Sequence, residues 1–185
     1  MTTPALAQIC QLFELYGAKN YGESCSQVTH SISCAWHAQQ DGAKSSLIVA
    51  AFLHDIGHFI ADNQQLVGFN RYGHIDHAEI GANWLAQRGF PASVYQPIRY
   101  HVVAKRYLMT KLNSNELSHA SSQTLIAQGG LLSSMDQKNF EKSECFNQAV
   151  KLRRYDDLGK PLKPITLTIT PWLGLIDQVL TENNT

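Results

Sequence analysis

Residues 47–58 read LIVAAFLHDIGH, in which seven apolar residues precede His54, Asp55 and, one turn later, His58. The pattern predicts a helix over 46–56 that ends at Gly57 and is apolar on all sides, as in the centre of a bundle. An imidazole and a carboxylate at the end of a buried helix need partners, because burying either one alone is costly. Imidazole binds iron, zinc or manganese, and a carboxylate can bridge two cations. The stretch therefore predicts a metal site in the core.

Further candidate ligands lie on both sides of this stretch. His30 lies upstream, and His77, His101 and either Asp156 or Asp157 lie downstream. Each of these histidines falls on a separate predicted helix with an apolar face. Six ligands in one short chain indicate a two-metal enzyme rather than a protein with a single structural ion.

Length and composition describe an ordinary globular protein. With 185 residues, 44% hydrophobic and 16% charged, the chain is expected to form one domain over residues 1–185. A formal net charge of zero gives no indication of nucleic acid or of an acidic membrane surface as partner. The apolar run at 47–53 is too short to span a bilayer. Four cysteines without a CxxC pair, and an N-terminus without signal-peptide features, predict a cytoplasmic protein with reduced thiols.

The rest of the chain is helical in its pattern, so the fold class is predicted to be all-α. A second helix is expected to begin after Ser24 or Ser26 and to run to about Gln40. Asp76 and Glu79 have the spacing of a capping box. The remaining predicted helices are 4–16, 77–88, 97–109, 118–128, 136–143, 145–156 and 171–182, and one strand-like run covers 165–170.

These motifs resemble the HD-domain superfamily, helical bundles with the metal site in the core. Within it they are most similar to the mixed-valence di-iron oxygenases that cleave organophosphonates. The His-Asp pair is common to hydrolases, whereas the segments at 101–108 and 128–130 are typical of the oxygenase branch. The segments that carry the resemblance are Gly22-Glu23 with Ser26-Gln27 and His30, AFLHDIGH (51–58), HAEIGA (77–82), HVVAKRYL (101–108), LSHAS (117–121), QGG (128–130) and LRRYDD (152–157).

The resemblance implies two iron ions, in an Fe(II)/Fe(III) pair, with O₂ as co-substrate. Its pattern of two adjacent acidic residues selects Asp156 over Asp157, which spacing alone leaves open. His74 is a weaker competitor of His77, and His37 and His119 are expected to be structural or exposed. The implied ligands are His30, His54, Asp55 as the bridge, His77, His101 and Asp156.

The same resemblance implies residues that bind the substrate and take part in catalysis. Lys105 and His58 each lie one turn after a candidate ligand, where they can reach an anion beside the metals. A lid is expected from Tyr21 and Glu23, although Tyr21 is one residue closer to Glu23 than the family pattern has it. The expected phosphonate contacts are His58, Lys105, Ser121, Thr124 and Arg153, and the expected catalytic residues are Asp55, His58 and Lys105.

The implied activity is O₂-dependent cleavage of the C–P bond in a small anionic 1-hydroxyphosphonate. The substrate would be 2-amino-1-hydroxyethylphosphonate or an analogue such as the 2-trimethylammonio compound, and the products phosphate and a carboxylate such as glycine. Two alternatives stay open: a metal-dependent HD phosphohydrolase acting on a phosphate ester or nucleotide, and a non-catalytic HD module. The expected state is a monomer or a small homo-oligomer with no nucleic-acid or membrane partner.

Overall fold

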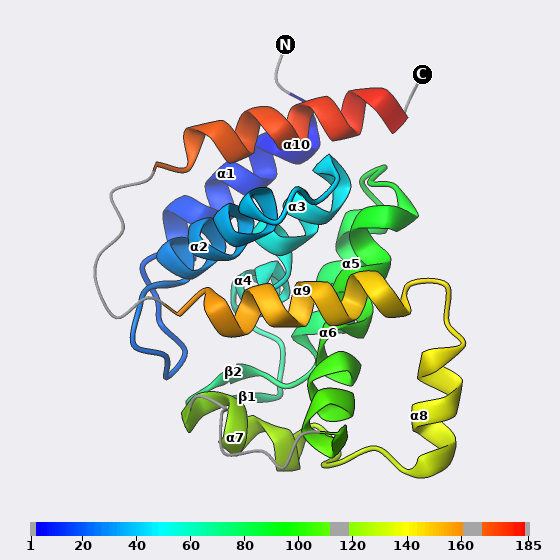
Figure 1. Cartoon of the computed structure of the whole chain (residues 1–185). Helices are drawn as coiled ribbons and strands as arrows, with labels where there is room; N and C mark the ends of the chain where they lie inside the picture. The colour runs from blue at the N-terminus through cyan, green and yellow to red at the C-terminus, as the bar shows by residue number, and fades with distance from the viewer. Residues whose placement is uncertain (1–2, 112–118, 161–167, 184–185) are drawn as a thin grey trace.

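Helices make up almost all of the regular structure in the computed structural model, which describes residues 3–111, 119–160 and 168–183 (Figure 1). A short antiparallel hairpin, β1 (Phe69–Asn70) and β2 (Gly73–His74), connects two of the helices. The all-α prediction is confirmed. In chain order the helices are α1 (Pro4–Tyr16), α2 (Gln27–Gln40), α3 (Ser45–Leu53), α4 (Ile56–Asn63), α5 (His77–Ala86), α6 (Ala92–Lys111), α7 (His119–Ala127), α8 (Ser134–Glu141), α9 (Phe146–Leu158) and α10 (Thr170–Asn183).

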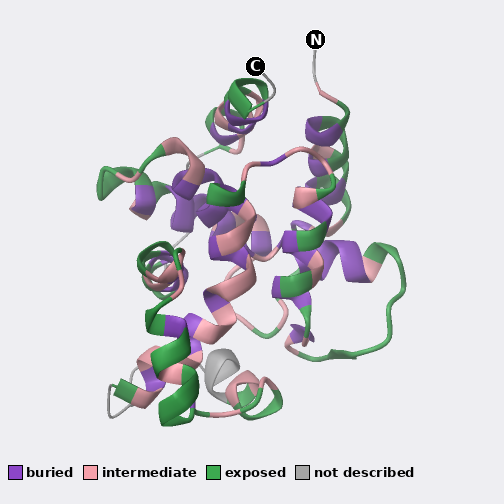
Figure 2. Ribbon diagram, turned by 90° about the vertical axis from the view of Figure 1, so that its right-hand side faces the viewer, coloured by how far each residue is buried: buried purple, intermediate pink, exposed green. Residues whose placement is uncertain are grey.

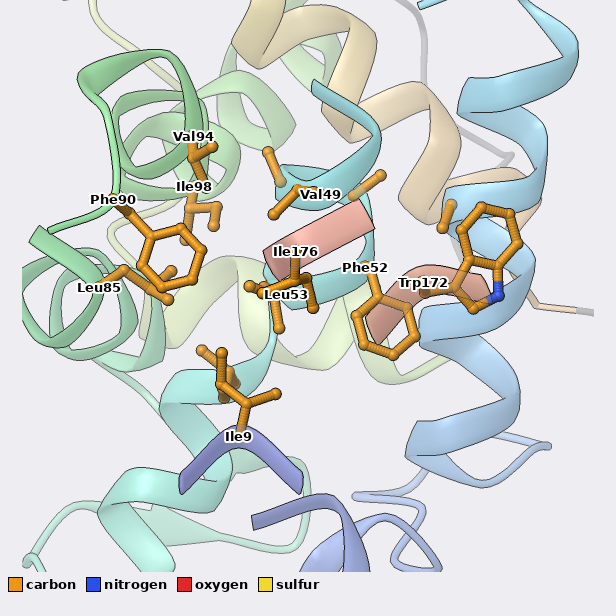
Figure 3. Close-up of a cluster of buried hydrophobic side chains, with 14 of the residues drawn as sticks. Ile9, Val49, Phe52, Leu53, Leu85, Phe90, Val94, Ile98, Trp172 and Ile176 are labelled. Carbon is orange, nitrogen blue, oxygen red and sulfur yellow. The ribbon is translucent and has the colours of Figure 1, made fainter. Parts of the chain in front are cut away.

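The apolar helix α3 lies at the centre of the bundle, as the sequence predicted. Every residue from Leu47 to Leu53 is buried, and α3 packs against α2, α6, α9 and α10. Figure 3 shows Phe52 of α3 beside Trp172 of α10, with ring centroids 6.5 Å apart. Buried residues follow the inner faces of the surrounding helices, whereas exposed residues follow the outer ones (Figure 2). Burial of each large side chain contributes about 1.5–3 kcal/mol, so this core stabilises the elements that hold the site.

The helix predicted over 46–56 ends earlier than expected, and Gly57 does not end it. Helix α3 stops at Leu53, His54 and Asp55 form the break, and α4 begins at Ile56. Gly57 lies inside α4, where a Cβ would come within 1.9 Å of the His77 carbonyl oxygen on α5. The glycine is therefore explained by the close approach of α4 and α5, which sequence periodicity does not reveal.

Other element boundaries differ from prediction only locally. Ser26 caps α2 by accepting a hydrogen bond from Thr29 N at 3.3 Å. The predicted capping box at α5 is wrong, because Asp76 makes no side-chain cap bond and Glu79 contacts Arg99 instead. Helix α6 begins at Ala92 and includes Pro97. Half of the strand predicted at 165–170 lies outside the described residues; in the other half the prediction is wrong, because 168–169 are not in a strand and Thr170 begins α10.

The described helices include none that is both long and apolar enough to cross a membrane. The four cysteines are free thiols.

Candidate metal centre

The structure brings the six predicted ligands together in the middle of the bundle. They come from separate elements: α2, the break between α3 and α4, the start of α5, the middle of α6 and the end of α9. Five of them are buried, and the Asp55 side chain is 15% exposed. The six residues are His30, His54, Asp55, His77, His101 and Asp156.

The four imidazoles share one hydrogen-bonding arrangement. In each ring, Nδ1 lies within hydrogen-bond distance of a backbone carbonyl oxygen, to which its N–H donates a hydrogen bond. A neutral imidazole that donates from Nδ1 keeps a lone pair on Nε2, and metal-binding histidines are oriented in this way. The pairs are His30 with Gly159 (2.9 Å), His54 with Ala51 (2.9 Å), His77 with His74 (2.9 Å) and His101 with Ile98 (2.6 Å).

The Nε2 atoms face each other in two pairs. The His30 and His54 atoms are 3.2 Å apart, and the His77 and His101 atoms are 3.0 Å apart. Burial and the neighbouring His77 lower the pKa of His101 to about 3, so its Nε2 is not protonated at neutral pH. His77 has a lowered pKa as well, because of burial, and the two lone pairs of His77 and His101 repel at this distance unless a cation lies against both. Neighbouring ligands at right angles, each about 2.1 Å from one ion, are about 3.0 Å apart, so each pair fits one metal ion.

Asp55 lies between the two pairs and presents one carboxylate oxygen to each. Its Oδ2 is 3.4 Å from His54 Nε2 and 3.6 Å from His30 Nε2. Its Oδ1 is 3.5 Å from His77 Nε2 and 3.9 Å from His101 Nε2. Burial raises the pKa of Asp55, but the surrounding imidazoles, His54 first, hold it well below the usual range. An ionised carboxylate in this position can bridge two cations.

Asp156 completes the set on the side of His30. Its Oδ1 is 3.3 Å from His30 Nε2, and its Oδ2 accepts a hydrogen bond from Arg153. The carboxylate of Asp157 also contacts Arg153, and its side chain is 39% exposed. This geometry favours Asp156 over Asp157 as the ligand.

Cys34 is a neighbour of the centre that sequence reasoning did not select. Its thiol is buried, with Sγ 3.7 Å from both ring nitrogens of His30. Burial raises the pKa of this thiol, against the effect of His30. The sequence signal that could have selected Cys34 is its position four residues after His30, on the same face of α2. His37, on the same helix, packs against Trp36.

His58 and His74 have roles that differ from those of the four imidazoles. His58 Nδ1 accepts a hydrogen bond from His74 N at 2.9 Å, so the ring proton of neutral His58 is on Nε2. Burial and His77 hold the pKa of His58 well below its usual value. His58 is therefore a neutral donor whose Nε2 lies 4.0 Å from Asp55 Oδ1. Both ring nitrogens of His74 bond to backbone atoms of Val67 and Asp76, so His74 is structural.

A cavity of about 60 Å³ adjoins the centre, and three cations line it. Lys105 is 4% exposed and donates to Thr124 Oγ1 at 2.9 Å; burial and Arg153 lower its pKa to about 7. Arg153 contacts Asp156 and Asp157. Lys160, which was not predicted as a site residue, lies 2.9 Å from Glu23 Oε1. Ser121 is in α7, but its side chain lies outside the described part of the structure.

Tyr21 and Glu23 also line this cavity, from the link between α1 and α2. The Tyr21 ring lies over His58 with centroids 4.9 Å apart, and its hydroxyl donates to Asp62 Oδ2 at 3.0 Å. Burial and Asp62 raise the pKa of the phenol. In this structure the Tyr21 hydroxyl is thus directed to Asp62.

Comparison with known proteins identifies the family of this chain. Residues 28–125 match the HD domain family. A hydroxymethylphosphonate dioxygenase of Gimesia maris is 38% identical over 159 residues, which are 83% of this chain and 78% of that protein. The chain belongs to the HD-domain phosphonate dioxygenase family. Other relatives of this chain have similar coverage. A [1-hydroxy-2-(trimethylamino)ethyl]phosphonate dioxygenase (glycine-betaine-forming) of Leisingera caerulea is 36% identical, over 80% of this chain and 76% of its own.

An uncharacterized protein of Acanthamoeba polyphaga mimivirus is 39% identical to this chain, over 95% of this chain and 81% of its own length. The family predicted from the sequence motifs is therefore confirmed, and membership makes the chain an enzyme. The cluster of histidines and aspartates in the core is a candidate site for its metal.

Proposed function

We propose that this dioxygenase uses two iron ions and O₂ to cleave the C–P bond of a small 1-hydroxyphosphonate. The observation that carries the proposal is the position of Asp55, whose two oxygens face two different pairs of imidazole Nε2 atoms. Such a carboxylate suits a pair of metal ions better than a single structural ion. The two relatives that act on phosphonates support the substrate class.

The donor set is compatible with iron. It consists of four imidazole nitrogens and carboxylate oxygens, which suit iron, whereas thiolate-rich sets favour zinc or clusters. His30, His54 and Asp156 would hold one ion, His77 and His101 the other, and Asp55 both. When bound, the iron pair supplies the redox chemistry by which electrons pass from the substrate to O₂.

The residues around the cavity would bind and orient the substrate. The Lys105 ammonium and the Arg153 guanidinium supply positive charge for the phosphonate, and Arg153 has a planar geometry suited to paired oxygens. The Thr124 hydroxyl, 2.9 Å from Lys105 Nζ, can donate to the same group. His58 can donate from Nε2, because its Nδ1 is already an acceptor. We also assign Ser121 to this group.

The reaction that these groups would serve is balanced with one O₂ per substrate. For hydroxymethylphosphonate, the C–P bond breaks, one oxygen atom enters formate and the other enters phosphate, and one proton is released. Four electrons leave the organic substrate and reduce O₂. With a substituent at C2, the carboxylate would be glycine or an analogue.

We further propose that residues 1–185 form a single domain.

Metal content and electron paramagnetic resonance test the proposal directly. Protein prepared with iron under anaerobic and aerobic conditions should contain about two irons per chain and give a coupled mixed-valence signal. Added hydroxymethylphosphonate should consume one O₂ for each phosphate released. Protein that holds zinc or magnesium, with turnover of phosphate esters and no O₂ uptake, would instead identify an HD phosphohydrolase and refute the proposal.

A further inference from the structure

One side chain that lines the cavity has a polar atom with no role in the proposed metal centre or among the proposed phosphonate contacts. Gln27 is the first residue of α2 and is 2% exposed. Its Oε1 is buried, and no hydrogen-bond donor from the part of the chain that the structure describes lies within bonding distance. The residue lines the same cavity as Lys105 and the ligand cluster. A buried acceptor without a donor is uncommon, because each such group carries a desolvation cost.

The backbone holds Gln27 firmly in this position. Its N–H donates to Lys19 O at 2.7 Å, and the preceding residue, Ser26, is the N-cap of α2. His30 follows one turn later on the same helix, so Gln27 and this proposed ligand share a helix face. The backbone of Gln27 is therefore fixed, and its side chain, 2% exposed, is confined at the wall of the cavity.

An amide is a suitable acceptor here because it carries no charge. Asp55 and Asp156 already place two carboxylates at the centre, and Glu23 places a third on the cavity wall. A further carboxylate would repel a phosphonate, whereas an amide oxygen accepts a hydrogen bond without adding negative charge. Gln128 has a second amide oxygen without a donor on this cavity, but its side chain is only half-buried.

We infer that Gln27 is a substrate-binding residue whose amide oxygen accepts a hydrogen bond from a donor group on the phosphonate. The inference rests on the proposed function, and it adds a determinant of specificity: a phosphonate with a donor beside the C–P bond is preferred to one without. Two groups supply that chemistry, the hydroxyl at C1 and an amine at C2. A fully methylated amine has no proton to donate.

Calorimetric binding to the iron-loaded protein without O₂ tests this inference independently of turnover. Dissociation constants are measured for methylphosphonate and hydroxymethylphosphonate, which differ by the C1 hydroxyl, with wild-type protein and Gln27→Met. If Gln27 accepts from this hydroxyl, the preference for hydroxymethylphosphonate should fall about 10-fold in the variant. Methionine keeps the length of the side chain and removes the acceptor.

A second pair of ligands examines the other donor. Ethylphosphonate and 2-aminoethylphosphonate differ by the amine, and the same comparison shows whether Gln27 contributes to that preference. A drop in the preference for either donor supports the inference and identifies its source. Gln40→Met is the matched control, because Gln40 lies on the same helix but is exposed. If Gln27→Met folds poorly, Gln27→Asn replaces it. This variant withdraws the amide oxygen by one methylene and should show the same fall in preference.

The outcomes separate this inference from the proposed function. If wild-type protein binds none of the four phosphonates, the proposed function fails. If wild-type protein binds them and Gln27→Met weakens all four equally, Gln27 contacts only water or shapes the cavity. In that case the inference is overturned while the proposed function stands.

Discussion

Replacing Gly57 by alanine is predicted to separate α4 from α5 and to weaken one half of the metal centre. An alanine Cβ at this position would lie 1.9 Å from the His77 carbonyl oxygen and 2.9 Å from Gly81 N. Ordinary contact for a Cβ begins at 3.4 Å, so the two helices must move apart by about 1.5 Å. The neighbouring atoms belong to the backbone and cannot turn away.

The expected cost exceeds the intrinsic benefit of alanine in a helix. Alanine is favoured over glycine by up to about 1 kcal/mol in a helix interior, whereas overpacking costs about 1–3 kcal/mol and occasionally more. Because backbone atoms must move, we expect the upper end of this cost and a net loss of about 2 kcal/mol in the free energy of unfolding. For a chain of 185 residues this corresponds to a melting temperature lower by roughly 4–8 °C.

The same displacement would move His77 away from Asp55 Oδ1, which now lies 3.5 Å from its Nε2. We therefore expect the variant to bind closer to one iron than two, measured by metal analysis after anaerobic loading. Thermal unfolding gives the change in stability. Gly174→Ala is the control, because Gly174 lies inside α10 and a Cβ there has no neighbour within 4 Å. The control should gain up to about 1 kcal/mol.

A Gly57→Ala protein that melts at or above the wild-type temperature and still binds two irons would refute this reasoning. It would mean that α4 and α5 can separate without cost. Loss of stability with full iron content would refute only the link between this contact and the position of His77.

Three further predictions follow from the site. Asp156→Ala should lose iron and Asp157→Ala should keep it, as measured by metal analysis; reversed losses would exchange the two assignments. His58→Ala should keep both irons and raise the dissociation constant for the phosphonate about 10-fold, because a neutral donor is lost; loss of iron would instead make His58 a ligand. Lys105→Met should have a free energy of unfolding about 4 kcal/mol higher than that of wild type at pH 7, measured by urea unfolding. Because the pKa of Lys105 is about 7 when folded and 10.5 when unfolded, wild-type stability should rise relative to the variant up to about pH 10; a constant difference, or an equal effect of exposed Lys111→Met, would contradict the burial argument.

The sequence predicted the central helix and the cluster because both depend on local patterns. Seven consecutive apolar residues can be satisfied only in a core, and the polar pair that follows them needs partners there. His30, His77 and His101 could be selected because each falls on the apolar face of its own helix. The family resemblance then favoured Asp156, and the geometry agrees.

The features that sequence reasoning missed depend on contacts between distant segments. From local sequence, Gly57 looked like a helix stop. The contact that explains it, with the His77 carbonyl, is made by another helix and is not visible in the sequence. The position of the ring proton of His58 depends on the hairpin, whose His74 N–H donates to Nδ1 of His58. The sequence does not reveal this contact. Helix α4 and the hairpin are short, so neither has enough residues for a clear period. The Tyr21 hydroxyl contacts Asp62, 41 residues away, which no local pattern indicates.

The order of the proposed ligands along the chain has a consequence for biosynthesis. Asp55, His77 and His101 lie within one continuous stretch that ends in α6. The other set needs Asp156, and the orientation of His30 depends on the Gly159 carbonyl, both near the end of α9. At about 5–20 residues per second, several seconds of translation separate the two events. The half of the centre around His77 and His101 is thus synthesised before the segment that completes the other half, although α6 gains its main packing partner only with α9.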